Sequence, residues 1–536
     1  MKKFFALYIV IFISANNSTA QEKLQYHNIR TDKNRHIVPW YNPDPSVAYD
    51  QVIKLVWNFW DTMRRDMNGL PYYMNHQVWK TPHNDYRGIG GDQFSMAISS
   101  WVLYYQYTGN ENVKENLRFL ADYYLCHGLS PINVKWPNIP FPYNTLEYSG
   151  VYDGDMIIGK DITQPDKAGS FGLELIQVYK IYQRDVYLDA AIKIANTLAA
   201  HIKTGDENNS PLPFKVNAVT GEVAQINNNN NYGTGNTGNS YTSNWAPTMS
   251  LFLDLIKLNK GETEEYKKAF DLILAWMKKY PMQNNKWGPF FEDIPGWSDT
   301  QINAVTFARF MMEHPEYFPG WKSEVKSIID WVYKKLSNTK WKKYGVTVIN
   351  EQTAYQVPGN SHTARQAAAE LLYVSLTGDS TNYNNAILQL NWCTYMVDVD
   401  GKNRYPQDDV WLTDGYGDYV RHYLRAMSAN PALAPVDRDH ILSTTSVIQR
   451  ADYSGSLYKN YFPAETDTSN INVYYTTFDE MGTESLRLTK KPAVVLFDKT
   501  KAVENNTAEG YEWKPLAKGG ILTIHRADNK TVTILR

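Results

Sequence analysis

The chain has 536 residues, a formal net charge of −2 and 43% hydrophobic residues. The near balance of charge excludes a polybasic nucleic-acid-binding protein, and the hydrophobic content is enough for a large core. Aromatic residues make up 14% of the chain, with 16 Trp and 39 Tyr. Such residues stack on sugar rings at a surface and also fill large helical cores, so composition alone leaves both uses open.

The first twenty residues have the pattern of an export signal. Lys2 and Lys3 form the charged start, residues 4–13 the apolar stretch and residues 18–20 a small-residue cleavage site. No Cys follows that could carry a lipid, and no later stretch is apolar over about 18 residues. We expect an exported protein, periplasmic or secreted, without membrane insertion.

Six segments in chain order share a short polar turn followed by an amphipathic pattern. Apolar residues fall at i, i+3, i+4, i+7, i+8 and i+11, as in residues 266–277 and 325–336. One apolar stripe indicates one buried face, as expected of helices on the outside of a ring. These outer helices are predicted to begin near Asp50, Val113, Tyr187, Tyr266, Ser323 and Tyr383.

A second set of segments alternates with the first and is small or apolar around more of its circumference. Residues 364–369, with four alanines, illustrate the close packing expected of an inner helix. Six inner and six outer helices close a ring, so the sequence predicts a mainly α fold, an (α/α)6 toroid within residues 21–435. An open α-solenoid is the alternative. The inner helices are predicted to begin near Asp92, Ala168, Trp245, Gln301, Ser361 and Asp414.

After Pro435 the pattern changes to short β-like runs, at residues 473–475, 493–497 and 521–524. They predict a small C-terminal β region over residues 436–536, either a separate domain or strands packed on the ring. No Pro- or Ser-rich linker precedes it, so tight docking is expected.

The two cysteines, Cys126 and Cys393, lie far apart in helical patterns. We expect two buried free thiols, with a single disulfide as the alternative. No CxxC, HExxH or paired-His spacing indicates a metal site, and we expect no cofactor.

The loops that enter the inner helices carry the candidate functional residues. Aligned helix N-termini favour an anion, such as a uronate or a sulfate, at that end of the ring. Asp92 and Gln93 follow a glycine cluster, and Asp92 is either an N-cap or a catalytic carboxylate. Residues 147–155 and 166–170 contain carboxylates and Lys167, and are either an acid/base pair or a polar turn. Trp245 opens the next inner helix, either as a sugar platform or as core.

Two later loops add further candidates. Residues 287–297 place Glu292 among aromatic residues that include Trp297, like a substrate rim. His362 and Arg365 lie three positions apart at the start of an inner helix and therefore share a face. Histidine can move a proton near neutral pH, and arginine presents a bidentate fork to a carboxylate. The remaining candidates are Tyr355 and Asn360 in the same loop, and Asp414 and Tyr416 at the last inner helix.

The export signal, the Gly-Gly-Asp-Gln sequence at 90–93, the Ser361-His362 loop and residues 414–419 together resemble a known group. They are similar to the (α/α)6 uronic-acid-active enzymes of polysaccharide-utilisation loci in Bacteroidetes. Within this group the resemblance is to exo-β-glucuronidases and to the ulvan oligosaccharide dehydratase of marine flavobacteria. It implies an acidic oligosaccharide as the partner, with no nucleic acid and no obligate protein partner.

Two reactions on a non-reducing-end glucuronic acid follow as hypotheses. In the first, a base removes H5 and an acid helps O4 leave as water, which gives a 4,5-unsaturated uronate. In the second, two carboxylates hydrolyse the glycosidic bond. A non-catalytic glycan-binding protein is the third hypothesis. The predicted catalytic residues are His362, Tyr355, Asp92, Tyr416 and Asp414, and the predicted substrate-binding residues are Arg365, Gln93, Trp245, Glu292, Trp297 and Asn360.

Overall fold

A computed structural model gives the arrangement of most of the chain. It describes residues 22–65, 69–71, 91–141, 149–151, 157–224, 240–290, 297–403, 415–453, 471–505 and 509–536. The export-signal segment, Glu292 and Asp414 lie outside these residues, as do the carboxylates of residues 152–156. Asp92 and Tyr416 belong to described helices, but their side chains lie outside the described part.

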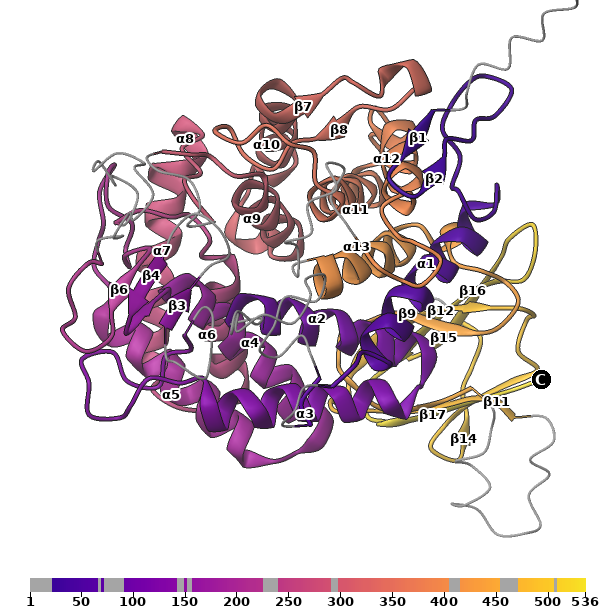
Figure 1. Cartoon of the computed structure of the whole chain (residues 1–536). Helices are drawn as coiled ribbons and strands as arrows, with labels where there is room; N and C mark the ends of the chain where they lie inside the picture. Colours follow the sequence, from indigo (N-terminus) through magenta and orange to yellow (C-terminus); the bar gives the residue numbers. More distant parts are fainter. Residues whose placement is uncertain are drawn as a thin grey trace, which may run out of the picture.

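Helices alternate between an inner and an outer ring, as Figure 1 shows. Each inner helix packs on the next, and α13 packs back on α2, which closes the ring. The prediction of an (α/α)6 toroid is therefore confirmed, and the open solenoid is wrong. The inner helices are α2 (Gly91–Thr108), α4 (Pro165–Tyr182), α6 (Ala246–Leu258), α9 (Gln301–Glu313), α11 (Asn360–Thr377) and α13 (Gly415–Ala429). The outer helices are α1 (Pro45–Asp61), α3 (Glu111–His127), α5 (Asp185–His201), α7 (Thr263–Lys279), α10 (Trp321–Leu336) and α12 (Tyr383–Thr394), with a short α8 (Pro281–Asn284) after α7.

Short elements connect the helices. Among the described residues, 3-10 turns lie at η2 (Pro315–Tyr317), η3 (Lys342–Tyr344) and η4 (Pro431–Leu433). Short antiparallel pairs are formed by β1 (Lys23–Leu24) with β2 (His27–Asn28), β3 (Ser149–Val151) with β4 (Ile157–Lys160), β5 (Ile162–Thr163) with β6 (Val216–Asn217), and β7 (Ser337–Asn338) with β8 (Val348–Ile349).

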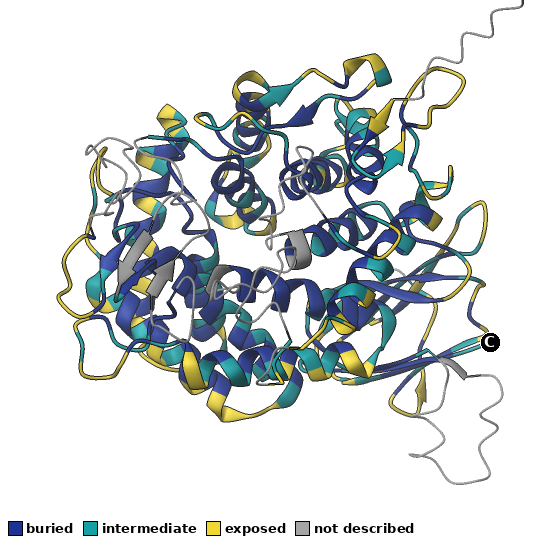
Figure 2. Cartoon of the chain, viewed as in Figure 1, coloured by how far each residue is buried: buried dark blue, intermediate teal, exposed yellow. Residues whose placement is uncertain are grey.

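The burial of each helix follows its sequence pattern (Figure 2). In the outer helix α7, acidic residues in the first turn and Lys278 and Lys279 in the last complement the helix dipole, and the apolar stripe is buried. In the inner helix α11, residues 360–371 are all buried. Its alanines let α9, α12 and α13 approach closely. Several of its buried polar residues belong to the candidate functional site.

Gly169 marks the closest approach of two inner helices. A Cβ at this position would lie 1.8 Å from Thr248 Oγ1 and 2.9 Å from Thr248 Cα, in α6. We expect Gly169→Ala to lower the free energy of unfolding by roughly 1–3 kcal/mol, because the helices must move apart. Gly172→Ala is the matched control, since its Cβ would meet only side-chain methyls, of Leu251 at 2.7 Å and of Ile194 at 3.3 Å, and no backbone atom closely. Thermal unfolding midpoints test this, and equal losses for the two variants would contradict it.

The C-terminal region is a two-layer antiparallel β structure with its own core. One sheet has the order β10-β11-β17-β13-β14 and the other β15-β16-β12-β9. Along β16, buried residues alternate with partly exposed ones, as expected of a strand with one covered face. The strands are β9 (His440–Thr444), β10 (Ile448–Asp452), β11 (Ile471–Thr477), β12 (Gly482–Leu488), β13 (Val494–Phe497), β14 (Thr500–Lys501), β15 (Gly510–Pro515), β16 (Gly520–Arg526) and β17 (Thr531–Leu535).

The β region packs on α2, α4 and α13 through β9 and β10, beside which it lies in Figure 1. The His440 ring stacks on Tyr107 with 3.8 Å between centroids, and its Nδ1 lies 2.9 Å from Tyr107 O. Gln106 donates to Leu442 O at 3.3 Å, and Gln449 donates to Lys180 O at 2.8 Å. Because these residues stand at the C-terminal ends of α2 and α4, the β region covers that end of the ring.

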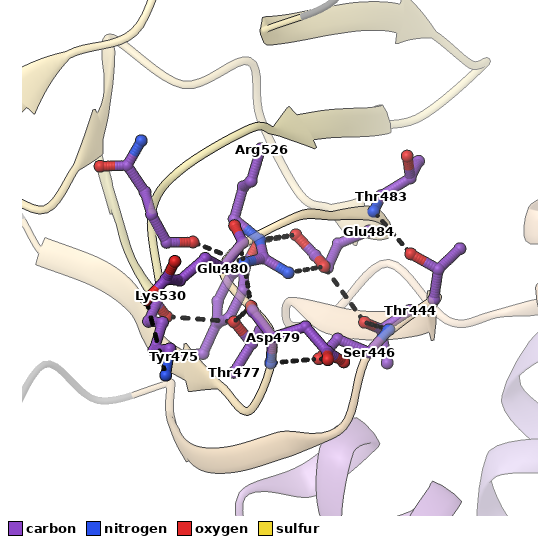
Figure 3. Close-up of polar contacts among 12 residues, drawn as sticks. Thr444, Ser446, Tyr475, Thr477, Asp479, Glu480, Thr483, Glu484, Arg526 and Lys530 are labelled. Carbon is purple, nitrogen blue, oxygen red and sulfur yellow. Dashed lines mark hydrogen bonds and ion pairs between the residues drawn. The ribbon is translucent and has the colours of Figure 1, made fainter. Parts of the chain in front are cut away.

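A buried ion pair supports the turn between β9 and β10 (Figure 3). Arg526 donates to both carboxylate oxygens of Glu484, at 2.8 and 2.7 Å, and both side chains are fully buried. Thr444 in β9 donates to Glu484 at 3.1 Å. Ser446 in the turn donates to Asp479 at 2.7 Å. This network fixes the turn that faces the ring.

The cysteine prediction is half wrong. Cys393 is buried in α12 and free, but Cys126 is exposed, because it lies in the last turn of α3 on the outer surface. In the part of the chain that the structure describes, no helix has the length and apolar character needed to cross a membrane.

Candidate functional site

A cavity of about 140 Å³ runs along the axis of the ring. Every inner helix contributes to its wall, and the lining combines apolar residues with an unusual number of charged ones. In the described part of the chain, four arginines face it, together with Glu174, Glu313 and His422. The arginines are Arg309 in α9, Arg365 in α11, and Arg421 and Arg425 in α13.

Asp418 in α13 is the centre of the charged cluster at this cavity. It is 2% exposed. Arg365 donates to its Oδ2, Arg421 Nε donates to its Oδ1 at 2.6 Å, and His422 Nε2 lies 3.2 Å from the same oxygen. Burial raises the pKa of Asp418, but the two guanidiniums and His422 outweigh it and hold the pKa well below its usual range. Asp418 is therefore ionised, and its spacing of three and four residues to Arg421 and His422 places all three on one helix face.

Two buried histidines belong to the same cluster. Burial lowers the pKa of His422 well below its usual range, although Asp418 opposes this. Burial and the Arg365 charge lower the pKa of His362, in the first turn of α11, to about 3. Both imidazoles are therefore neutral near pH 7 and can accept a proton. His422 lines the cavity, so it is the better placed to act on a bound molecule.

Arg365 is held in one orientation by neighbours on two other helices. Besides Asp418, its Nη1 donates to Gln301 Oε1 in α9 at 2.9 Å. Gln301 donates to Gln366 at 3.3 Å, and Gln366 donates to Glu370 Oε1 at 2.7 Å. This series of hydrogen bonds connects the charged cluster at the cavity to the packed interface between α9 and α11.

Glu370, the last residue in this series of hydrogen bonds, makes the stability of the folded protein depend on pH. Burial raises its pKa from 4.5 to about 8, against lowering by hydrogen bonds from Gln366 and Tyr333. Between these values the folded chain holds a proton that the unfolded chain releases, so stability falls as the pH rises through this window. We compare the free energies of unfolding of Glu370→Gln and the wild type. We expect their difference to shift in favour of Glu370→Gln by roughly 2 kcal/mol as the pH rises from about 5 to about 8.

Unfolding midpoints of both proteins at the two pH values measure this gain. Glu207→Gln is the control, because Glu207 is exposed. A difference between wild type and Glu370→Gln that stays constant with pH would contradict the expectation.

The starts of α4 and α6 form a rigid part of the cavity wall. Lys167 Nζ lies 2.7 Å from Asp166 Oδ2, donates to Phe290 O at 2.9 Å and stands 3.2 Å above the Phe290 ring. Asn244 donates to the same Asp166 oxygen at 2.9 Å. Asn244 and Phe290 line the cavity. Asp166 and Lys167, from the segment predicted to hold either an acid/base pair or a polar turn, thus fix two residues of the wall.

Several predicted substrate-binding residues lie elsewhere. Trp245 is fully buried and donates to Thr242 O at 2.7 Å, so its ring is part of the core and offers no stacking face. The Asn360 amide donates to Asn403 and accepts from Ser361 N at 2.8 Å. Its hydrogen bonds therefore stabilise the start of α11. Trp297 lines a separate surface hollow of about 700 Å³, where Lys286 Nζ stands 4.7 Å from its ring.

The other predicted residues are only partly placed. Gln93 is buried in the first turn of α2, and Tyr355 is half-buried in the segment before α11. Neither lines the central cavity, whereas Arg365 does. Besides Arg365, the cluster contains Asp418, Arg421 and His422, which the sequence analysis placed in the last inner helix without giving them a role. Their spacing on one face was the signal that could have selected them.

Solved structures with the same architecture cover most of the ring. A cellobiose 2-epimerase from Spirochaeta thermophila is 13% identical and has a TM-score of 0.53, with 72% of this chain and 96% of that chain covered. A sugar epimerase from a ruminal bacterium is 11% identical, with a TM-score of 0.50 and coverage of 70% and 98%. A D-mannose isomerase is 12% identical, with a TM-score of 0.50 and coverage of 73% and 99%.

No family model matches the sequence, and no curated protein matches it. Identities this low establish a shared fold and nothing finer. The chain therefore has the (α/α)6 toroid fold of these proteins, with a β region after it.

Proposed function

We propose that the chain is a carbohydrate-active enzyme that moves a proton at a sugar carbon next to a carboxylate. The observation that carries the proposal is the pairing of a neutral His422 with an ionised Asp418 on the wall of the central cavity. A base 3.2 Å from a carboxylate and beside fixed cations suits formation of a carbanion-like intermediate. The similar structures are named as sugar epimerases and a sugar isomerase, which supports a sugar as the ligand.

The charge of the cavity supports an acidic sugar. Four arginines line it against Glu174 and Glu313, and a low-dielectric wall strengthens their attraction for an anion. We propose the non-reducing-end glucuronic acid of ulvan-type oligosaccharides as the substrate. A bound carboxylate would also raise the pKa of His422 and so strengthen it as a base.

The proposed reaction is the loss of water from this uronate. His422 takes the proton from C5, and the electron pair forms the C4–C5 double bond as the C4–O4 bond breaks. The leaving hydroxyl takes the proton from the imidazolium and departs as water, so His422 returns to its neutral form. Arg421 and Arg365 would stabilise the charge that develops on the uronate carboxylate.

Hydrolysis is the second candidate, and one observation favours it. Burial raises the pKa of Glu174, which faces the cavity, to about 7. A carboxyl group that keeps its proton near neutral pH can act as the general acid of a glycosidase. This reaction would release glucuronic acid and shorten the chain.

Incubation of the purified protein with glucuronate-terminated ulvan oligosaccharides separates these reactions. Loss of one water without shortening, with new ultraviolet absorbance from the conjugated uronate, is the result expected for dehydration. Free glucuronic acid without that absorbance would support hydrolysis and overturn dehydration. Saturable binding with no change in mass would support a glycan-binding protein. We also propose export to the periplasm, which fractionation of the source cells would test.

A further inference from the structure

A second cavity, of about 300 Å³, lies between the ring and the β9–β10 turn. We call it the closed-end chamber, because the β region covers it. Leu173, Glu174, Arg309 and Arg425 line both this chamber and the axial cavity. The rest of its polar lining is made of neutral groups, the hydroxyls of Ser99, Ser428, Ser443, Thr444 and Ser446 and the amides of Gln106 and Gln177.

Arg425 is the cation of this chamber without a counter-ion in the described part of the chain. Arg309 pairs with Glu313 at 2.6 Å, and Arg421 pairs with Asp418. For Arg425, no ion pair within 4 Å and no hydrogen bond to another described residue is formed. Burial, followed by the charges of Arg309 and Arg421, lowers its pKa. Arginine nevertheless stays charged in proteins, and the half-buried Arg425 side chain is only partly solvated, so an anion beside it would be stabilised.

The nearby carboxylates do not balance this charge. Glu174 accepts a hydrogen bond from Ser99, and burial raises its pKa to about 7, so it carries only part of a negative charge near neutral pH. Asp254 pairs with Lys180 at 3.1 Å. Asp418 is shared by Arg365 and Arg421. The chamber therefore has an excess of positive charge, and the hydroxyls of Ser428 and Ser443 in its wall can donate to a bound group.

We propose that the closed-end chamber binds a compact inorganic anion, in the size range from halide to sulfate, on the Arg425 guanidinium. Hydroxyl groups such as those of Ser428 and Ser443 would complete the anion's hydrogen bonds. This site goes beyond the proposed function, because it needs no sugar, although Arg425 also lines the axial cavity with His422. The anion would supply the missing counter-charge where α13, α4 and the β region meet.

Crystals of the full chain grown with sodium bromide provide the direct test. Anomalous scattering is expected to show bromide in the closed-end chamber beside Arg425, and to show none there in Arg425→Gln. Bromide beside Arg421 or Arg365 alone would assign the anion affinity to the substrate cavity and overturn the proposal. If glucuronate displaces the bromide, the chamber belongs to the sugar site, which also overturns it.

Thermal unfolding in solution gives a second readout that does not depend on crystals or on activity. At constant ionic strength, replacing gluconate by chloride is expected to raise the unfolding midpoint of the wild type by roughly 2–3 °C. Arg425→Gln should lose this dependence whatever its own stability, while Arg118→Gln, at an exposed pair with Glu115, should keep it. Equal midpoints of the wild type in both salts would overturn the proposal.

Discussion

His422→Asn is expected to lower kcat/KM by about 10²–10⁴-fold on any substrate that the wild type turns over. Asparagine can still donate to Asp418, so the ion pairs of Asp418 with Arg365 and Arg421 are kept. It cannot accept a proton from carbon, and the loss therefore reports the proton transfer itself. Initial rates with the oligosaccharide substrate measure the change.

His314→Asn is the matched control for this variant. His314 lies at the end of α9, beside Glu316 on the surface, and its replacement should leave the rate unchanged. The wild-type rate should also persist as the pH falls through the ordinary histidine range, because the pKa of His422 is lowered and the base stays neutral. Full activity in His422→Asn would remove this residue from the mechanism.

Arg526→Met is expected to destabilise the β region by roughly 3–5 kcal/mol, because it leaves the Glu484 carboxylate buried without its partner. Arg526 also donates to the carbonyls of Asp479, Glu480 and Asn529, at 2.8, 2.9 and 2.5 Å. The β11–β12 turn and the β16–β17 turn, which carry these carbonyls, would both lose their donor. Calorimetric unfolding, followed as a separate transition of the β region, measures the effect.

Two further variants distinguish the loss of the ion pair from nonspecific destabilisation. Lys530→Met removes a nearby surface cation, 3.8 Å from Glu480, and should cost at most about 1 kcal/mol. Glu484→Leu combined with Arg526→Met should be less destabilising than Arg526→Met alone, because no unpaired charge then remains. A double variant that is as unstable as the sum of the single variants would contradict this explanation.

The ring was predictable because its signals are local. A helix with one buried stripe repeats its apolar residues within a few turns, and the start of each helix is set by the turn before it. Gln301 and Tyr383, predicted as starts, begin α9 and α12. The β region was predictable for the same reason, since short β-like runs are also local. The run at residues 521–524 lies within β16, along which buried and partly exposed residues alternate.

The composition of the site was much less predictable. The loop pattern made Trp245 and Asn360 equal candidates with Arg365, because all three lie at inner-helix starts. Only the packing shows that the Trp245 indole and the Asn360 amide form hydrogen bonds with buried groups of the protein itself. The opposite error concerns Asp418 and His422: the sequence analysis included their segment among the candidates but selected Asp414 and Tyr416 from it.

By itself, the sequence determined the mainly helical character, the alternation of inner and outer helices and the change to β structure near residue 435. Each of these depends on periods and turns within one segment. Only the tertiary structure decided that Arg365 pairs with Asp418, that His422 is neutral and that Arg425 lacks a counter-ion in the described chain. Charge pairing and pKa depend on distance and burial between segments that are far apart in sequence, so no local pattern specifies them.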